Sequence, residues 1–169
     1  MNISNVNEYL RFGIKGSHAA LWLQQQGITT PDSANHWVQS AQGAMVLRLG
    51  QGEFLIEDQS GGQVVAQLLA ASQAKPLGVY VVPRADAAFR LNGEGVESVL
   101  AKICMLDITH ELQANALLMT QVAGVSAVLL KEGLGEQSSY RLWCDVSYQA
   151  YMLNTLSNMT SLIETSEPN

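Results

Sequence analysis

Apolar residues recur along this chain at the spacings typical of helices and strands. Residues 96–103 place four apolar side chains at positions i, i+3, i+4 and i+7, with polar and charged residues between them. This spacing predicts an amphipathic helix that buries one face. The buried face consists of Val96, Val99, Leu100 and Ile103. In an earlier apolar segment, Ser17 is placed to cap the start of another helix and Gly27 to end it.

These two helical segments belong to an internal repeat. Residues 12–28 match residues 89–105, each residue pairing with the one 77 positions further on, as Gly16 does with Gly93. Both segments predict a short strand, a glycine turn and then a helix. Repetition at a fixed spacing indicates two halves that share one architecture.

A hairpin and a second helix follow each repeated segment. Further strands are predicted at residues 43–49, 52–57, 78–82, 116–122, 125–131 and 140–144, and further helices at residues 64–69 and 147–156. Short hairpins alternating with helices predict an α+β fold, with antiparallel or mixed sheets and helices packed on one face. We expect a single domain over residues 1–169, with pseudo-repeated halves at about 9–76 and 77–157 and loose tails at 1–8 and 158–169.

Charge is sparse in this chain. Charged residues make up 14% and hydrophobic residues 47% of its 169 residues, whereas roughly 25% of an average soluble domain is charged. The formal net charge is −6 and no stretch concentrates the basic residues, which argues against binding to nucleic acid or to an anionic membrane. An exterior so poor in charge indicates that part of it is covered by another protein.

The cysteine count and the N-terminal segment bear on the compartment. Cys104 and Cys144 allow one disulfide at most, which favours a reducing compartment. The first residues contain no basic segment followed by an apolar one, and no apolar stretch reaches the roughly 18 residues of a membrane-spanning helix. We therefore expect a cytoplasmic protein.

The glycine turn before residues 96–103 is similar to part of a dinucleotide-binding motif. Gly93 and Gly95 follow a predicted strand and open a predicted helix, but Ser98 stands where that motif has its third glycine. The first copy of the repeat builds the same turn without the Gly-x-Gly spacing. Chain reversal explains the glycines better than a nucleotide site does.

Other groupings of reactive residues have simple structural explanations. Cys104, Asp107 and His110 are spaced by three, but a divalent metal needs three or four convergent ligands, and a buried thiol followed by a polar loop explains them. Glu57 and Asp58 are neighbours on a strand and face opposite ways, so they predict a solvated strand end rather than an acid/base pair. Serine-hydrolase and phosphate-loop motifs do not occur. We expect no catalytic, cofactor-binding or metal-binding residue in this chain.

The arginines leave two interpretations open. Arg11 and Arg90 border the strands that lead into the repeated helices, and Arg84 follows Pro83. A guanidinium at such a position can bind a carboxylate of a partner protein, or it can form an internal salt bridge, for instance to Asp86 or Asp107.

Five segments spread over residues 11–156 occur in a distinctive order. They are RFGIKGSHAALWLQQQGI, Asn35-His36-Trp37, GAMVLRLGQGEFLIED, VPRADAAFRLNGEGVESVLAKICMLDI and YRLWCDVSYQAYMLNTL. Together they resemble the gamma subunit of heterotetrameric sarcosine oxidase. That subunit is in turn similar to the folate-binding domain of the glycine-cleavage T-protein and related aminomethyltransferases, which implies two ferredoxin-like α+β halves.

The resemblance implies a subunit without chemistry of its own. In that family the assembled enzyme oxidatively demethylates sarcosine, and larger alpha and beta flavoprotein subunits hold FAD, FMN and NAD and pass the one-carbon unit to tetrahydrofolate. The resemblance therefore implies no cofactor in this chain and these two subunits as its partners. Sparse charge agrees with this, because interface cores are depleted in Lys, Glu and Asp.

The same relationship implies one alternative, a stand-alone protein that binds a folate or a pterin. Folate-handling relatives place acidic residues on the strand after a Gly-Gly turn. Here Ala44 follows Gly43 and Val125 follows Gly124, so neither copy supplies the acid. This difference favours the subunit.

The expected partner contacts are aromatic and arginine side chains outside the predicted core: Trp37, Arg84, Tyr148 and Tyr151. Trp143 and Met152 are further candidates, whereas Trp22 lies on a helical apolar stripe and is predicted to be core. Exposed residues of this kind would also allow the isolated chain to self-associate.

Overall fold

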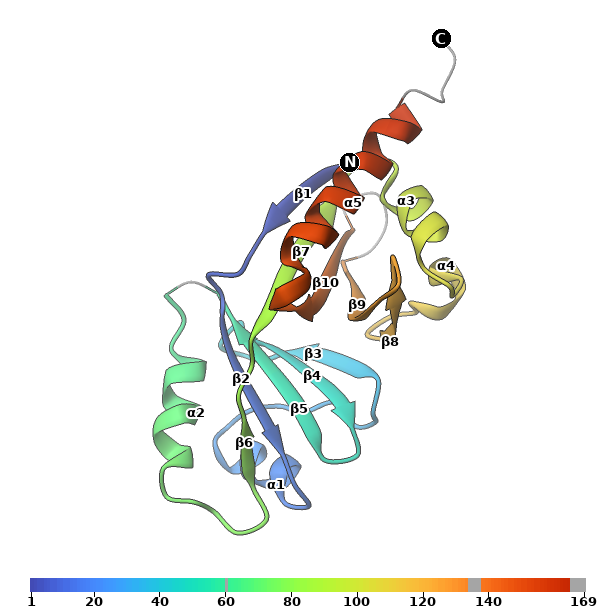
Figure 1. The fold of residues 1–169 in the computed structure, drawn as a ribbon. Coiled ribbons are helices and arrows are strands. Elements are labelled where there is room, and N and C mark those ends of the chain that lie inside the picture. Colours follow the sequence, from blue (N-terminus) through green and yellow to red (C-terminus); the bar gives the residue numbers. More distant parts are fainter. Residues whose placement is uncertain (60, 134–137, 165–169) are drawn as a thin grey trace. The chain divides into compact units, whose positions relative to one another are not determined.

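The computed structural model describes residues 1–59, 61–133 and 138–164, with side chains to residue 162 (Figure 1). The chain divides into two compact units. Unit 2 is Glu8–Arg84, and unit 1 combines Met1–Asn7 with Ala85–Asn169. Residues 77–84, assigned to the second half from the sequence, therefore belong to unit 2.

Unit 2 contains a five-stranded antiparallel sheet in the order β3-β4-β5-β2-β6. Its elements are β2 (Leu10–Lys15), α1 (Ala19–Gln25), β3 (His36–Gln39), β4 (Met45–Gly50), β5 (Glu53–Asp58), α2 (Val64–Ser72) and β6 (Tyr80–Val82). The sequence predicted all of these except β3, which was interpreted as a loop. That interpretation was wrong because the turn-forming residues before β3 concealed a strand that pairs with β4.

Unit 1 contains a second five-stranded antiparallel sheet, in the order β1-β7-β10-β9-β8. Its elements are β1 (Asn2–Asn5), β7 (Asp86–Asn92), α3 (Val96–Ile103), α4 (Ile108–Glu111), β8 (Leu117–Val122), β9 (Val125–Glu132), β10 (Ser139–Asp145), the 3-10 turn η2 (Val146–Tyr148) and α5 (Gln149–Glu164). The expected hairpin turn lies at Ala123 and Gly124, which both have positive φ. The predicted α+β fold is confirmed, with antiparallel pairing throughout both sheets.

The two sheets have the same strand order. Strands β3, β4, β5, β2 and β6 of unit 2 correspond to β8, β9, β10, β7 and β1 of unit 1. In each sheet the last strand comes from the chain just before the other unit's repeated segment: β1 precedes β2 yet pairs with β7, and β6 precedes β7 yet pairs with β2. The internal repeat therefore includes the edge strands, which the sequence comparison had missed.

This exchange corrects the expectation of a loose N-terminus. Asn2–Asn5 form β1, because their backbone groups complete the sheet of unit 1 against Phe89–Asn92. At the other end, α5 continues to Glu164, past the predicted start of a loose tail at residue 158. The rest of that tail lies outside the described residues.

Each sheet buries one face under helices (Figure 1). In unit 2, α1 and α2 pack on the sheet through a cluster that includes Phe12, Leu23 and Leu68, and Trp22 is part of it as predicted. In unit 1, the predicted stripe of α3 packs with residues of α4, α5 and the sheet. Non-polar side chains at helical and strand spacing drive both cores.

The ends of α1 test the two expected caps. Gly27 ends the helix as predicted: it has φ +78°, its N–H donates to Gln24, and the N–H of Ile28 donates to Leu23 at 3.0 Å. The start was predicted wrongly. His18 occupies the capping position and no side chain caps the helix, since the Ser17 segment is packed against the loop before β6.

Two further observations concern the compartment. Cys104 and Cys144 are free thiols, and both are buried. Within the described part of the chain, no helix has the length and apolar character needed to cross a membrane.

Candidate functional site

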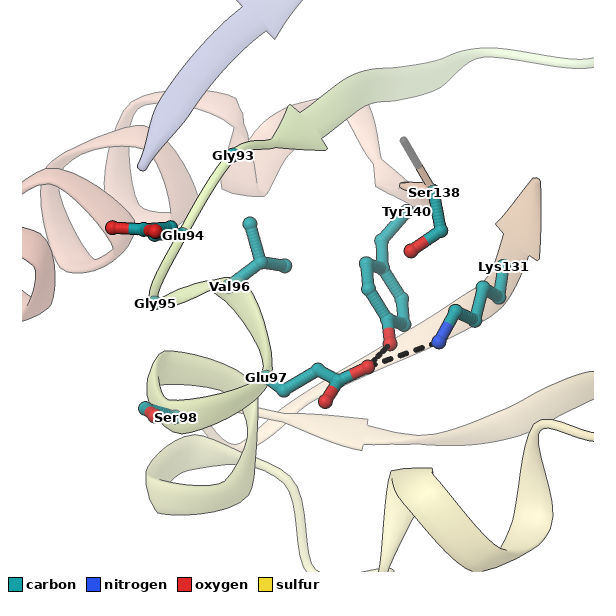
Figure 2. Close-up of a pocket in the computed structure, with 9 residues that line it drawn as sticks. All are labelled: Gly93, Glu94, Gly95, Val96, Glu97, Ser98, Lys131, Ser138 and Tyr140. Atoms are coloured by element: carbon teal, nitrogen blue, oxygen red, sulfur yellow. Dashed lines mark hydrogen bonds and ion pairs between the residues drawn. The ribbon is translucent and has the colours of Figure 1, made fainter. Parts of the chain in front are cut away.

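A groove of about 750 Å³ lies in unit 1 where β7 turns into α3 (Figure 2). It is lined by Gly93, Glu94, Gly95, Val96, Glu97, Ser98, Lys131, Ser138 and Tyr140. The groove contains the glycine turn that the sequence compared with a dinucleotide motif. Its polar side chains come from α3, β9 and β10, from the turn before α3 (Glu94) and from the residue before β10 (Ser138).

The glycines of this groove serve the turn. Gly93 and Gly95 have φ of +88° and +81°, a region that favours glycine because it has no Cβ. Gly95 occupies the capping position of α3, and no side chain caps the helix. The interpretation of these glycines as a chain reversal is confirmed.

Glu97 joins α3, β9 and β10 through what we call the Glu97 cluster, namely Glu97, Lys131 and Tyr140. The Tyr140 hydroxyl donates to Glu97 Oε1 at 2.5 Å, and Lys131 Nζ donates to the same oxygen at 3.0 Å (Figure 2). Lys131 Nζ also lies 5.4 Å from the centroid of the Tyr140 ring. One carboxylate oxygen therefore binds helix α3 to two neighbouring strands.

The contacts fix the protonation states of the cluster. Hydrogen bonds from Tyr140 and Lys131 lower the pKa of Glu97, and the hydrogen bond to Glu97 raises the pKa of Lys131. Burial, helped by the bond to Glu97, raises the pKa of Tyr140 to about 12. At neutral pH the cluster consists of a carboxylate, an ammonium and a neutral phenol, and none of the three exchanges a proton easily.

The groove is a poor match for a phosphate group. The uncapped N–H groups of α3 would attract an anion, but Glu94 and Glu97 supply two carboxylates beside them. The ammonium of Lys131 is already paired with Glu97. The electrostatics of this site therefore favour a structural role, in which the cluster holds α3 on the sheet, over a nucleotide-binding site.

The Glu97 cluster could not be predicted from the sequence. Its hydrogen bonds join residues 34 and 43 positions apart, and the helical pattern identified Glu97 only as part of a solvated face. The deciding feature is strand register, because Tyr140 and Lys131 are direct partners across β10 and β9. A hydrophobic pattern predicts strands but not their pairing.

Arg11 and Arg90 form internal ion pairs. Arg11 Nε donates to Glu57 Oε2 at 2.7 Å, and Arg90 lies 3.2 Å from Glu132. Arg141, which the sequence analysis did not single out, also faces Glu132 at 3.5 Å. In these pairs the acidic partner is a glutamate of the same sheet, instead of the suggested Asp86 or Asp107: Glu57 lies on the strand next to that of Arg11, and Glu132 lies on β9, two strands from Arg90.

The prediction of a solvated strand end at Glu57 and Asp58 was wrong. Each of these residues is only 3% exposed. Glu57 pairs with Arg11, and Asp58 accepts the backbone N–H of Val64 at 2.8 Å, which caps the start of α2. Burial is possible because each carboxylate has a partner, one across the sheet and one six residues along the chain.

The structure places Cys104 and Asp107 in different surroundings. Cys104 is 8% exposed and belongs to the core of unit 1, whereas Asp107 caps α4 through the backbone N–H of Thr109. Among the described residues, no three His, Cys, Asp or Glu side chains are arranged to hold a metal ion. The buried thiol was expected; the short helix α4 replaces the expected loop.

Two of the four candidate contact residues lie in unit 2. Trp37 lies on β3 instead of a loop and is half-buried, and its indole Nε1 has no hydrogen-bond partner in the described structure. Arg84 is also half-buried, and its aliphatic chain covers Gly13, where a Cβ would lie 2.8 Å from Arg84 Cδ.

The other two candidates, Tyr148 and Tyr151, lie in unit 1 and are exposed by 47% and 50%. The Tyr151 hydroxyl donates to the carbonyl of Ala123 at 2.9 Å. Trp143 and Met152, the further candidates, are 1% and 0% exposed and so were wrongly placed on the outside. Trp37 and Arg84 therefore lie in one unit, and Tyr148 and Tyr151 lie in the other.

The fold defines a class. The glycine cleavage system aminomethyltransferase T from Bartonella henselae, which is 12% identical, has a similar fold. It superposes with a TM-score of 0.66 over 91% of this chain and 44% of its own length. The chain therefore has the fold of that aminomethyltransferase region, and no known family model matches its sequence.

Two relatives found by sequence indicate a more specific kind of protein than the fold does. Two curated proteins named sarcosine oxidase subunit gamma, from Corynebacterium sp. (strain P-1) and an Arthrobacter species, are each 30% identical, over 75% and 74% of this chain. The resemblance seen in the sequence is thereby confirmed: the curated homologues of this chain are sarcosine oxidase gamma subunits. The matched region spans 62% and 61% of their lengths.

A solved structure gives the same relationship. A chain in the heterotetrameric sarcosine oxidase from Corynebacterium sp. U-96, in complex with pyrrole 2-carboxylate, superposes with a TM-score of 0.80. The superposition covers 99% of this chain and 87% of that one, at 23% identity. Nearly the whole chain therefore shares the fold of a component of that assembly.

Proposed function

We propose that this chain is a gamma-type subunit of a heterotetrameric sarcosine oxidase and that its role is structural. The observation that carries the proposal is the 30% identity to curated gamma subunits. The fold match over 99% of the chain to a component of a heterotetrameric sarcosine oxidase supports it independently.

The geometry of unit 1 fits a role without chemistry. Glu97 and Lys131 neutralise one another in the Glu97 cluster, and the shifted pKa values of the cluster keep its three members in single protonation states at neutral pH. A catalytic acid or base needs a pKa near the working pH. We assign the redox chemistry, with FAD, FMN, NAD and tetrahydrofolate, to larger alpha and beta flavoprotein subunits.

The test is assembly with those subunits. The chain is tagged and co-expressed with alpha and beta subunits of a sarcosine oxidase from the same organism, and the complex is purified through the tag and by gel filtration. We expect flavin absorbance and sarcosine-dependent hydrogen peroxide production to follow the tagged chain. Omission of the chain should lower the yield of the assembled enzyme.

The opposite result is equally clear. If the larger subunits assemble and remain fully active without this chain, and the tagged chain never elutes with them, the proposal is wrong. Titration of the isolated chain with tetrahydrofolate then tests the alternative of a stand-alone folate-binding protein. Saturable binding by the isolated chain would favour that alternative.

A further inference from the structure

At one end of the sheet in unit 2, three segments of backbone are in close contact at Gly16, Gly52 and Gly78. The N–H of Gly16 donates to Gly52 at 2.9 Å, and a Cβ on Gly16 would lie 2.1 Å from the carbonyl oxygen of Gly78. A Cβ on Gly52 would lie 2.5 Å from the oxygen of Gly16. The turn after β2, the turn before β5 and the loop before β6 thus meet backbone to backbone.

A histidine strengthens this junction. The N–H of His18 donates to the Gly78 carbonyl at 3.1 Å, and His18 Nδ1 lies 3.0 Å from the Leu77 carbonyl oxygen. The backbone of Leu77 is therefore held on a packed support. Side chains on such a support lose little further freedom when they bind a partner.

The junction presents large apolar side chains to solvent. Leu77 is 86% exposed and Tyr80 is 62% exposed. The Tyr80 ring lies over the turn, because a Cβ on Gly16 would be 3.3 Å from Tyr80 Cδ2. The exposed strand β6 is also at the edge of its sheet, so one side of its backbone is not paired within that sheet.

Two lysines border these side chains. Lys15 is the direct cross-strand partner of Tyr80, and Lys75 precedes Leu77 by two residues; both are exposed. Glu53 is the direct partner of Lys15 on the other side, in β5, but the structure records no ion pair between either lysine and another described residue. We call Lys15, His18, Lys75, Leu77 and Tyr80 the Leu77 surface.

The distribution of charge sets this surface apart from the rest of the chain. Unit 2 contains five acidic and five basic residues, whereas unit 1 contains ten acidic and four basic residues. The net charge of −6 therefore belongs to unit 1. Half of the four lysines of the chain border one apolar projection on the neutral unit.

We propose that the Leu77 surface docks onto a larger subunit of the enzyme, at an apolar hollow bordered by carboxylates. Leu77 and Tyr80 fill the hollow, and Lys15 and Lys75 pair with the surrounding acids. An acidic partner is favoured over a symmetric dimer formed through this surface, because two copies joined face to face would bring like charges together. This inference rests on the proposed function and names the surface through which it operates.

The test compares matched variants of the tagged chain with the purified larger subunits, by biolayer interferometry. Leu77→Asp removes the apolar projection, and the double variant Lys15→Glu/Lys75→Glu reverses the rim. Leu69→Asp, at a leucine 43% exposed on α2, and Lys102→Glu, in unit 1, are the matched controls. Far-UV circular dichroism confirms that each variant is folded.

We expect both test variants to raise the Kd by about tenfold or more, and both controls to change it less than about twofold. Raising the salt concentration from about 0.05 to about 0.5 M should weaken the binding of the wild-type chain, whereas it should strengthen the binding of the double lysine variant, because salt screens the repulsion between its glutamates and the carboxylates of the partner. The lysine variant keeps Leu77 in place, so it tests the surface even if Leu77→Asp perturbs its loop.

The outcomes separate this inference from the proposed function. If the wild-type chain binds the larger subunits and both test variants bind equally well, the Leu77 surface is not the interface, although the subunit role stands. If Leu77→Asp only abolishes self-association of the chain, a second copy is the occupant and the inference is wrong. If the wild-type chain does not bind at all, the proposed function fails first.

Discussion

The ion pair between Arg11 and Glu57 is the most deeply buried pair recorded in the described structure. The two residues face each other across β2 and β5, their N···O distance is 2.7 Å, and their side chains are 7% and 2% exposed. Each charge was removed from water on folding, and each is compensated by the other. Removing one partner therefore leaves a buried charge without its main compensation.

The expected magnitudes follow from that burial. Arg11→Met or Glu57→Leu alone should lower the free energy of unfolding by about 3–5 kcal/mol, the usual cost of breaking a buried pair. The double variant replaces both charges with apolar groups of similar volume, so it should recover most of the loss. The coupling between the two substitutions is the quantity that the structure predicts to be large.

Urea unfolding followed by far-UV circular dichroism measures all four proteins. Arg90→Met serves as the control, because the Arg90 side chain is 31% exposed and its pair with Glu132 is longer, at 3.2 Å. It should cost no more than about 1 kcal/mol. Single substitutions at Arg11 and Glu57 that cost as little as this control, or a double variant as unstable as the two singles added together, would refute the reasoning.

Three further predictions concern other parts of the fold. Asp58→Ala leaves the N–H of Val64 without its cap, and should cost about 1–2 kcal/mol of unfolding free energy in urea titrations. Glu97 has a pKa lowered from 4.5, so its carboxylate stabilises the fold above that pH and loses this contribution as the pH falls through the lowered value. Wild type should therefore lose more stability than Glu97→Gln between about pH 7 and pH 3, by up to about 1 kcal/mol because the side chain is 49% exposed. Gly16 has φ +135°, and Gly16→Ala places a methyl group 2.1 Å from the Gly78 oxygen. It should therefore lower the melting temperature, measured by calorimetry, more than Asp58→Ala or Glu97→Gln does.

Each of these predictions has its own control. Asp58→Asn keeps an acceptor for the helix and should lose less stability than Asp58→Ala. Equal pH profiles for wild type and Glu97→Gln would show that the carboxylate is not stabilised by its neighbours. The control for Gly16→Ala is Gly27→Ala. Gly27 has φ +78° and a Cβ added there would meet no atom within 4 Å, so this variant tests the effect of positive φ alone. If Gly27→Ala were as harmful as Gly16→Ala, backbone contact at the junction would not be the cause.

Local patterns predicted most of the elements of this fold. The apolar stripe of α3, the turn at Ala123 and Gly124 and the end of α1 at Gly27 are all set by residues within a few positions of one another. Such features are visible in the sequence because side-chain spacing and backbone preference act locally. The 77-residue repeat added the equivalence of the two halves.

The edge strands show where local patterns stop. Nothing in Asn2–Asn5 has the alternation of a buried strand, and the segment is a strand because β7 offers it a free edge. The exchange of β1 and β6 between the two units is a property of topology. A pairing partner more than eighty positions away leaves no signature in the segment itself.

The charged residues show the same difference between what local sequence predicts and what tertiary contacts decide. By itself the sequence determined where most of the helices and strands form, the repeat and the sparse charge, because these depend on spacing and composition. Only the tertiary structure decided that Glu57 and Asp58 are buried and that Glu97 binds Lys131 and Tyr140. The physical reason is that desolvation and pairing depend on which distant groups meet, and strand register sets those meetings after the local elements have formed.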